Sequence, residues 1–353
     1  TYCILFFSVG HRVMFDLFVF HIFSSDRLSA VAIALIMVSL IGMMVGPVWG
    51  NANPLLWSLL DKICGGLVAR TYNRNRSMAS LHFRGAILLT LYLLITGIIA
   101  AVALLVERRI GFSGLMTPLL LSLTLSGGTV WASLVKLHHA LRGKNGLTKG
   151  SYYQIAVSTR TDLNSTDDHG IIRVGIGLVA TSFDKGLVAP IFWFLIGGLP
   201  AAYIYCGIAA ACWSLSKDGF AKGIGTLALK LETAFGIVPQ ILSSVLIALA
   251  ALATPAAGMT RTIRGLLSGK GHAPYAEGGL AVTAIAYALG VSLGGPVEDI
   301  SGSVLKRSWV GSSKSTARVE CRHLRQAIYL GIMGFVWVFL FIVLGLLAWS
   351  FSA

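Results

Sequence analysis

The sequence predicts an all-α, polytopic integral membrane protein with about five to eight membrane helices, some of them short or re-entrant. Of the 353 residues, 56% are hydrophobic and only 12% are charged, and the mean hydropathy is +0.79. Soluble domains carry about 25% charged residues, so this chain has about half the proportion of charged residues that a soluble domain has on its surface and elsewhere. Apolar stretches of about 20 residues, the length that crosses a bilayer as a helix, also recur along the chain.

The predicted domain organisation is a single membrane domain, residues 30–353, preceded by a separate segment, residues 1–29. The N-terminal segment contains His11, Arg12 and Asp16 within an apolar run, which predicts an interfacial or weakly hydrophobic segment. Within the membrane domain, continuous apolar stretches predict helices that cross the bilayer. They are residues 30–50, 85–106, 112–137, 236–256 and 328–351. The third of these contains Pro118 and Gly127-Gly128, which predict kinks in its helix.

Three other segments are apolar or amphipathic without predicting a simple crossing. Residues 54–70 are amphipathic with two central charges, which predicts a helix on the membrane surface. Residues 187–213 are interrupted by the pair Gly197-Gly198, and they predict a hairpin of two short helices. Residues 280–293 are short, rich in small residues and end in glycine, which predicts a re-entrant or buried helix.

The basic residues predict how the protein is oriented in the membrane. Lys and Arg outnumber Asp and Glu by 28 to 14, giving a formal charge of +14. No RNA- or DNA-binding motif accompanies this charge, so nucleic acid is not a predicted partner. The basic loops instead predict contact with anionic lipid on the cytoplasmic side of a bacterial inner membrane, with a cytoplasmic segment at about residues 138–170. All of the basic loops lie on the cytoplasmic side only if residues 280–293 do not cross the membrane.

The stretch of residues 182–205 combines charge with a broken apolar run. Asp184 and Lys185 precede a glycine-interrupted helix, a pattern with which membrane proteins often build polar sites. The alternative interpretation is an ordinary membrane-entry loop with a flanking ion pair. Asp162, Asp184 and Glu232 all lie at predicted membrane edges on the same side, which allows these carboxylates to converge without establishing it. No metal site is predicted.

Three glycine-containing motifs, two of which also contain proline, resemble the CobD/CbiB family of cobalamin biosynthesis. They are GLVAPIFWFLIGGLPAAYIY at residues 186–205, ALGVSLGGP at 288–296 and SWVG at 308–311. The resemblance extends from about Gly46 to Gly311. It implies a membrane protein that joins aminopropanol phosphate to a carboxylate of adenosylcobyric acid in an ATP-dependent amide synthesis. ATP, Mg²⁺ and a corrinoid are the cofactors and substrates that this activity implies.

The polar motif residues of that family are mostly replaced in this chain. Asp162 and Arg173 match an aspartate and an arginine of the family. The family arginine that precedes this aspartate is missing, and Arg160 is the arginine nearest to Asp162. Lys230 and Glu232 belong to a partial match with an Arg-x-Asp-Asp motif of the family. Asp184 lies one place before a family aspartate. The family's remaining acidic, amide and lysine positions, and its histidine, fall on Gly46, Asn53, Gly177, Thr181, Ser182, Lys185, Cys206, Ala209, Cys212 and Glu277.

Two functions follow from this pattern of retained backbone motifs and replaced ionisable groups. The first is a family member that has lost catalysis and acts as a subunit, scaffold or ligand-binding component of a membrane assembly, with the lipid bilayer and other proteins as partners. The alternative is an active adenosylcobinamide-phosphate synthase, and its site residues would be Asp162, Arg173, Asp184, Lys230 and Glu232. Replacing a carboxylate removes any metal ligand or general base it supplied, so the first function is favoured.

Overall fold

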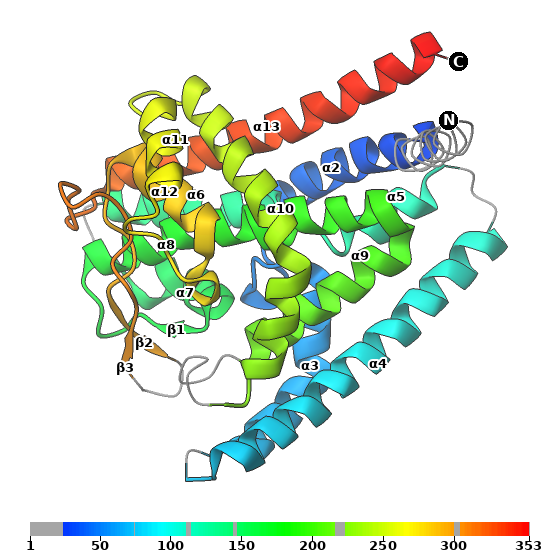
Figure 1. Ribbon diagram of the computed structural model, residues 1–353, viewed down its shortest axis with the longest axis horizontal. Helices are drawn as coiled ribbons and strands as arrows, with labels where there is room; N and C mark the ends of the chain where they lie inside the picture. Colours follow the sequence, from blue (N-terminus) through cyan, green and yellow to red (C-terminus); the bar gives the residue numbers. More distant parts are fainter. Residues whose placement is uncertain are drawn as a thin grey trace, which may run out of the picture.

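The computed structural model confirms the predicted all-α membrane fold (Figure 1). It describes residues 24–73, 75–110, 114–143, 147–215, 223–299 and 304–352. In these ranges, five helical stretches are long and apolar enough to cross a membrane. They are α2 (Ser25–Val45), α4 (Met78–Ile110), the continuous run of α8 (Asp168–Phe183), the π-helical turn η2 (Asp184–Val188) and α9 (Ala189–Leu215), then α10 (Thr226–Ala253) and α13 (Cys321–Ser352).

Shorter elements connect and cover these helices. Helix α2 begins at Ser25, inside the predicted N-terminal segment, whose residues 1–23 lie outside the described part of the chain. A small antiparallel sheet joins β1 (Thr161–Asp162), β2 (Pro296–Asp299) and β3 (Val304–Lys306) in that order. The shorter helices are η1 (Val48–Gly50), α3 (Leu55–Thr71), α5 (Met116–Ser122), α6 (Gly128–Arg142), α7 (Lys149–Thr159), α11 (Met259–Ser268), η4 (Tyr275–Glu277) and α12 (Gly279–Leu289).

Residues 112–137 do not form the single crossing that the apolar stretch predicts. The chain there divides into α5, with seven residues, and α6, with fifteen, and each is too short to span a bilayer. The break lies at Gly127-Gly128, where the backbone passes directly against α2. A Cβ added at Gly128 would lie 2.2 Å from the carbonyl oxygen of Ser39, so this approach requires glycine.

The break predicted near Gly197-Gly198 occurs at Gly198, which has a positive φ of 66°. Helix α8, η2 and the start of α9 run in one direction, and the rest of α9 turns away from that line (Figure 1). The first arm is longer than predicted because it begins at Asp168, where the Asp167 side chain accepts a hydrogen bond from the Gly170 amide. Just before the break, Arg27 donates to the carbonyl oxygen of Leu195 at 2.5 Å.

Helix α12 is short and buried, as predicted for residues 280–293. Its eleven residues extend about 16 Å, roughly half the hydrocarbon thickness of a bilayer. The segments before and after α12 contact each other, since the Gly311 amide donates to the Gly271 carbonyl oxygen at 3.0 Å. Helices α7, α11 and the sheet lie at the N-terminal end of α13 (Figure 1), which we call the polar end.

Candidate ligand-binding cavity

A cavity of about 550 Å³ lies at the polar end, a volume in the usual range for small-molecule sites. Its walls come from α3, α7, α8, η2, α9 and α10, and from the segments around η4 and the β2–β3 strands. Gly177, Thr181 and Lys185 follow one another at four-residue spacing along α8 and η2, so their side chains share one helical face. That face forms the centre of the cavity wall.

One wall of the cavity contains a buried ion pair. The Lys185 Nζ atom lies 2.9 Å from Glu232 Oε2, and the two side chains are 12% and 1% exposed. The same ammonium group lies 4.8 Å from the centre of the Tyr275 ring. The Tyr275 hydroxyl donates to the backbone oxygen of Glu232, and burial together with this carboxylate raises the pKa of the tyrosine.

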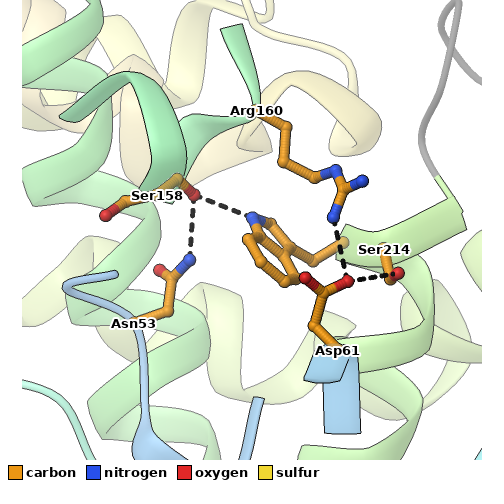
Figure 2. A network of polar contacts seen from close by, with 6 residues as sticks. Asn53, Asp61, Ser158, Arg160 and Ser214 are labelled. Atoms are coloured by element: carbon orange, nitrogen blue, oxygen red, sulfur yellow. Dashed lines mark hydrogen bonds and ion pairs between the residues drawn. The ribbon is translucent and has the colours of Figure 1, made fainter. Parts of the chain in front are cut away.

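A second ion pair, between the lining residue Arg160 and Asp61, lies next to the cavity (Figure 2). Arg160 Nη1 lies 3.1 Å from Asp61 Oδ1, and the Ser214 hydroxyl donates to the same oxygen at 2.9 Å. The guanidinium carbon lies 4.9 Å from the centre of the Trp213 ring, a cation–π arrangement. Arg160 is thereby held at the cavity from two directions.

The backbone around Arg160 is fixed by a separate set of hydrogen bonds. Arg160 ends α7 with a positive φ of 52°, a conformation that a non-glycine residue adopts only when its surroundings hold it. The preceding Ser158 carbonyl accepts from Trp213 Nε1 at 2.7 Å and from Asn53 Nδ2 at 2.8 Å (Figure 2). These bonds tie α7 to α9 and to the turn before α3.

Comparison with known proteins establishes the family. A family model described as "CobD/Cbib protein" matches residues 30–331. The chain belongs to the CobD/CbiB family. It is similar to proteins named "Cobalamin biosynthesis protein CobD": 36% identical over 86 residues to that of Brucella melitensis and 31% over 160 residues to that of Brucella anthropi. To the Listeria monocytogenes serotype 4b protein, it is 25% identical over 259 residues.

The extent of these matches differs among the CobD relatives. The Brucella melitensis match covers 24% of this chain and only 26% of that protein, and the Brucella anthropi match covers 40% and 45%. The Listeria match covers 71% of this chain and 79% of that protein. No solved structure matches the chain. The match to the Listeria protein, which covers most of this chain, is a distant one at 25% identity.

The structure brings most of the replaced family positions to this one cavity. Eight of them line it, although they come from four separate stretches of the sequence. Gly46 and the fully buried Cys206 are not among the lining residues. The eight are Asn53, Gly177, Thr181, Ser182, Lys185, Ala209, Cys212 and Glu277.

Two of the five residues named for the synthase alternative line the cavity, namely Arg173 and Glu232. Arg173 donates to the Ala317 carbonyl at 2.9 Å and lies 5.4 Å from the centre of the Trp309 ring. Lys230, by contrast, is exposed on α10 and is not a lining residue.

Asp162 and Asp184 lie away from the cavity lining. Asp162 is in β1 and accepts hydrogen bonds from the backbone and side chain of Asn164, which makes it a turn-forming residue. Asp184 is only 2% exposed and faces α10, where Ser243 Oγ donates to it at 2.9 Å and Gln240 Nε2 at 3.3 Å. The neighbouring Asp184 and Lys185 therefore have different partners.

The cavity is basic. Glu277, one of its two carboxylates among the described residues, accepts from the Ser308 amide at 2.9 Å, and burial raises the pKa of Glu277. The sequence predicted only that the basic loops contact anionic lipid, and it singled out Arg160 only as the arginine nearest to Asp162. The cationic lining residues are Arg160, Arg173, Lys185, Lys306 and Arg307, and the acidic ones are Glu232 and Glu277.

These residues do not fit the Mg²⁺ that the family's activity implies. Magnesium in phosphate-handling sites is held by one or two carboxylates that are open to the ion. Glu232 is occupied by the Lys185 ammonium at 2.9 Å, and Glu277 is bound to a backbone amide. The described part of the cavity thus offers cations and hydroxyl groups where a metal site needs carboxylates.

Gly177 shows how much room the missing side chains leave. A Cβ at Gly177 would meet nothing within 4 Å, although the residue lies inside α8. We expect Gly177→Ala to raise the free energy of unfolding by about 0.5–1 kcal/mol, because glycine is unfavourable in a helix interior. Thermal unfolding in lipid nanodiscs measures this. Gly207→Ala in α9 is the matched control and should destabilise, since its Cβ would lie 2.5 Å from Thr96 Oγ1; stabilisation by both would contradict this account.

Proposed function

We propose that this protein acts in cobalamin biosynthesis as a non-catalytic CobD/CbiB-family membrane protein that binds a small molecule at its polar end. One observation carries the proposal: the replaced family positions converge on a single cavity, and the carboxylate that remains at its centre is neutralised by Lys185. The cavity is retained, which supports ligand binding. Its chemistry differs from that of a metal-dependent synthase, which supports loss of turnover.

The size of the expected catalytic loss supports the same proposal. Removing one preorganised electrostatic group from an active site typically costs about 2.7–4 kcal/mol of transition-state stabilisation. Several such groups are replaced here, with Gly177, Ala209 and Cys212 at positions where the resemblance puts a glutamate, an asparagine and an aspartate. Together these losses would slow an amide synthesis by many orders of magnitude.

The direct test is an amide-synthesis assay on purified protein in nanodiscs. Adenosylcobyric acid, aminopropanol phosphate, ATP and Mg²⁺ are supplied, and the product is detected by mass spectrometry. The Listeria monocytogenes relative is assayed in parallel. The proposal predicts no product above the protein-free background. Product formation that Glu232→Gln abolishes and Lys314→Gln leaves intact would instead support the synthase alternative, because Lys314 is exposed and does not line the cavity.

The proposed assembly has its own test. The non-catalytic role includes protein partners in the membrane, so affinity purification from native membranes should recover at least one other membrane protein in stoichiometric amount. A chain with the cavity-lining substitution Gly177→Trp serves as the comparison, because it alters the ligand site and leaves the outer helical faces unchanged. Recovery of the protein alone under mild detergent conditions would contradict the scaffold part of the proposal.

The proposed orientation places the polar end in the cytoplasm of a bacterium. The concentration of basic loops supports it, since such loops are retained on the cytoplasmic side. Helix α13 starts at the polar end and runs away from it (Figure 1), so its last turn should reach the periplasm. Alkaline phosphatase fused after Phe351 should be active, and the same reporter fused after Gly269, in the loop after α11, should be inactive. The reverse activities would contradict this orientation.

A further inference from the structure

The cavity wall that contains the Glu232 carboxylate also contains a cation, the ammonium group of Lys185. The Lys185 ammonium is enclosed by the Glu232 carboxylate at 2.9 Å and the Tyr275 ring at 4.8 Å. The Cys212 side chain also contacts Glu232, from α9. Because Glu232 is 1% exposed, its charge is balanced inside the protein and not by solvent ions.

The rest of the cavity has an excess of donors. Arg160 uses Nη1 for Asp61, and a guanidinium group has five N–H donors. Arg173 and Lys306 add charge from α8 and β3. Ser182, which is 7% exposed, also lines the cavity.

We propose that this cavity binds an oxyanion-bearing small molecule directly, without a divalent metal ion, and that the Lys185 ammonium permanently fills the place beside Glu232. The proposal deepens the proposed function and rests on it, since it names the class of ligand that the cavity holds. Guanidinium groups bind phosphate and carboxylate through paired, charge-assisted hydrogen bonds and need no bridging ion.

Titration with simple oxyanions tests the ligand class. The full-length protein in nanodiscs is titrated calorimetrically with inorganic phosphate and, separately, with succinate, each in EDTA and in excess Mg²⁺. We expect at least one of the two to bind, with an affinity that Mg²⁺ changes by less than about twofold. The anion that binds distinguishes a phosphate-bearing from a carboxylate-bearing ligand. Absence of binding by both, or binding that requires Mg²⁺, would overturn the proposal.

Variants connect this binding to the cavity. Arg160→Gln should weaken it by about tenfold, as expected for the loss of one charge-assisted contact. Lys306→Gln should weaken it as well, and this exposed residue can be changed without breaking a buried ion pair. Lys314→Gln is the control: Lys314 is exposed and is not a lining residue, so its removal should leave the affinity unchanged. Equal affinities for all three variants would overturn the assignment to this cavity.

A manganese titration tests the role of Lys185. Mn²⁺ should leave the melting temperature of the wild-type protein unchanged. Lys185→Asp places a second carboxylate beside Glu232, so this variant should melt at a lower temperature and recover with Mn²⁺. Lys185→Met should melt lower without recovery. If Mn²⁺ raises the melting temperature of the wild type and Glu232→Gln removes this rise, a metal ion displaces Lys185. That result would overturn the proposal even if Lys185→Asp does not fold. None of these binding and melting measurements depends on turnover. Synthase activity would therefore refute the proposed non-catalytic function without deciding whether the cavity binds an oxyanion without a metal ion.

Discussion

Lys185→Met is expected to lower the free energy of unfolding by about 3–5 kcal/mol, the effect of removing one partner from a buried ion pair. The Glu232 carboxylate would remain 1% exposed with no opposite charge at 2.9 Å. Glu232→Gln should be less severe, because the amide oxygen of glutamine can still accept a hydrogen bond from the ammonium group. Chemical denaturation of the protein in nanodiscs measures both variants.

A double variant separates the ion pair from other effects of these substitutions. Lys185→Met combined with Glu232→Leu should recover much of the lost stability, since replacing both charges removes the unpaired group. The exposed pair of Arg322 and Glu320 is the control: its atoms are 3.0 Å apart, and Arg322→Met should cost less than about 1 kcal/mol. If Lys185→Met costs no more than Arg322→Met, the pair does not organise the cavity.

Gly128→Ala is expected to destabilise the protein by about 3 kcal/mol or more, near the upper end of the range for overpacking. The added Cβ would lie 2.2 Å from the Ser39 carbonyl oxygen and 2.6 Å from the Met43 amide nitrogen, and backbone atoms cannot move aside as a flexible side chain can. Gly42→Ala on the facing helix should have a similar effect, because its Cβ would lie 2.6 Å from the Thr129 amide nitrogen. Thermal unfolding in nanodiscs compares these variants.

The matched control for this contact is Gly97→Ala in α4. A Cβ there would meet nothing within 4 Å, and the substitution should be neutral or stabilising by up to about 1 kcal/mol. Equal effects of Gly128→Ala and Gly97→Ala would mean that α2 and α6 are not in direct backbone contact.

Features with a strong local pattern could be predicted from the sequence. Continuous apolar stretches located α2, α4, α10 and α13, because about 20 apolar residues have few stable alternatives to a membrane helix. The glycine pair at 197–198 located the break in α9, since Gly198 adopts a positive φ that favours glycine. The short length of α12 was equally visible in the sequence.

Contacts between distant residues could not be predicted in the same way. Asp184 and Lys185 are adjacent, and side chains of adjacent helical residues point about 100° apart. In the structure, Lys185 accordingly contacts Glu232, 47 positions away, and Asp184 accepts a hydrogen bond from Ser243, 59 positions away. The spacing of charges along the chain gives no information about such pairs. The Arg160–Asp61 pair, which spans 99 positions, is a further example.

Residues 112–137 were predicted as one crossing with a kink, and the structure has two separate short helices there. Hydropathy does not report close packing, so the contact of Gly128 with α2 could not be predicted from an apolar stretch. The small sheet was not predicted, because strands of two to four residues are too short to show an alternating pattern. Its β2–β3 strands contribute Lys306 to the cavity.

Genetic complementation tests the central claim most directly, namely that the family cavity persists in this chain without its catalysis. A bacterium that lacks its own CobD-family synthase is supplied with cobyric acid under conditions where growth requires cobalamin, and it expresses this protein at a level verified in the membrane. The account predicts no growth, while the Listeria monocytogenes relative restores it. Growth with this protein that Glu232→Gln abolishes and the control Lys314→Gln preserves would contradict the account.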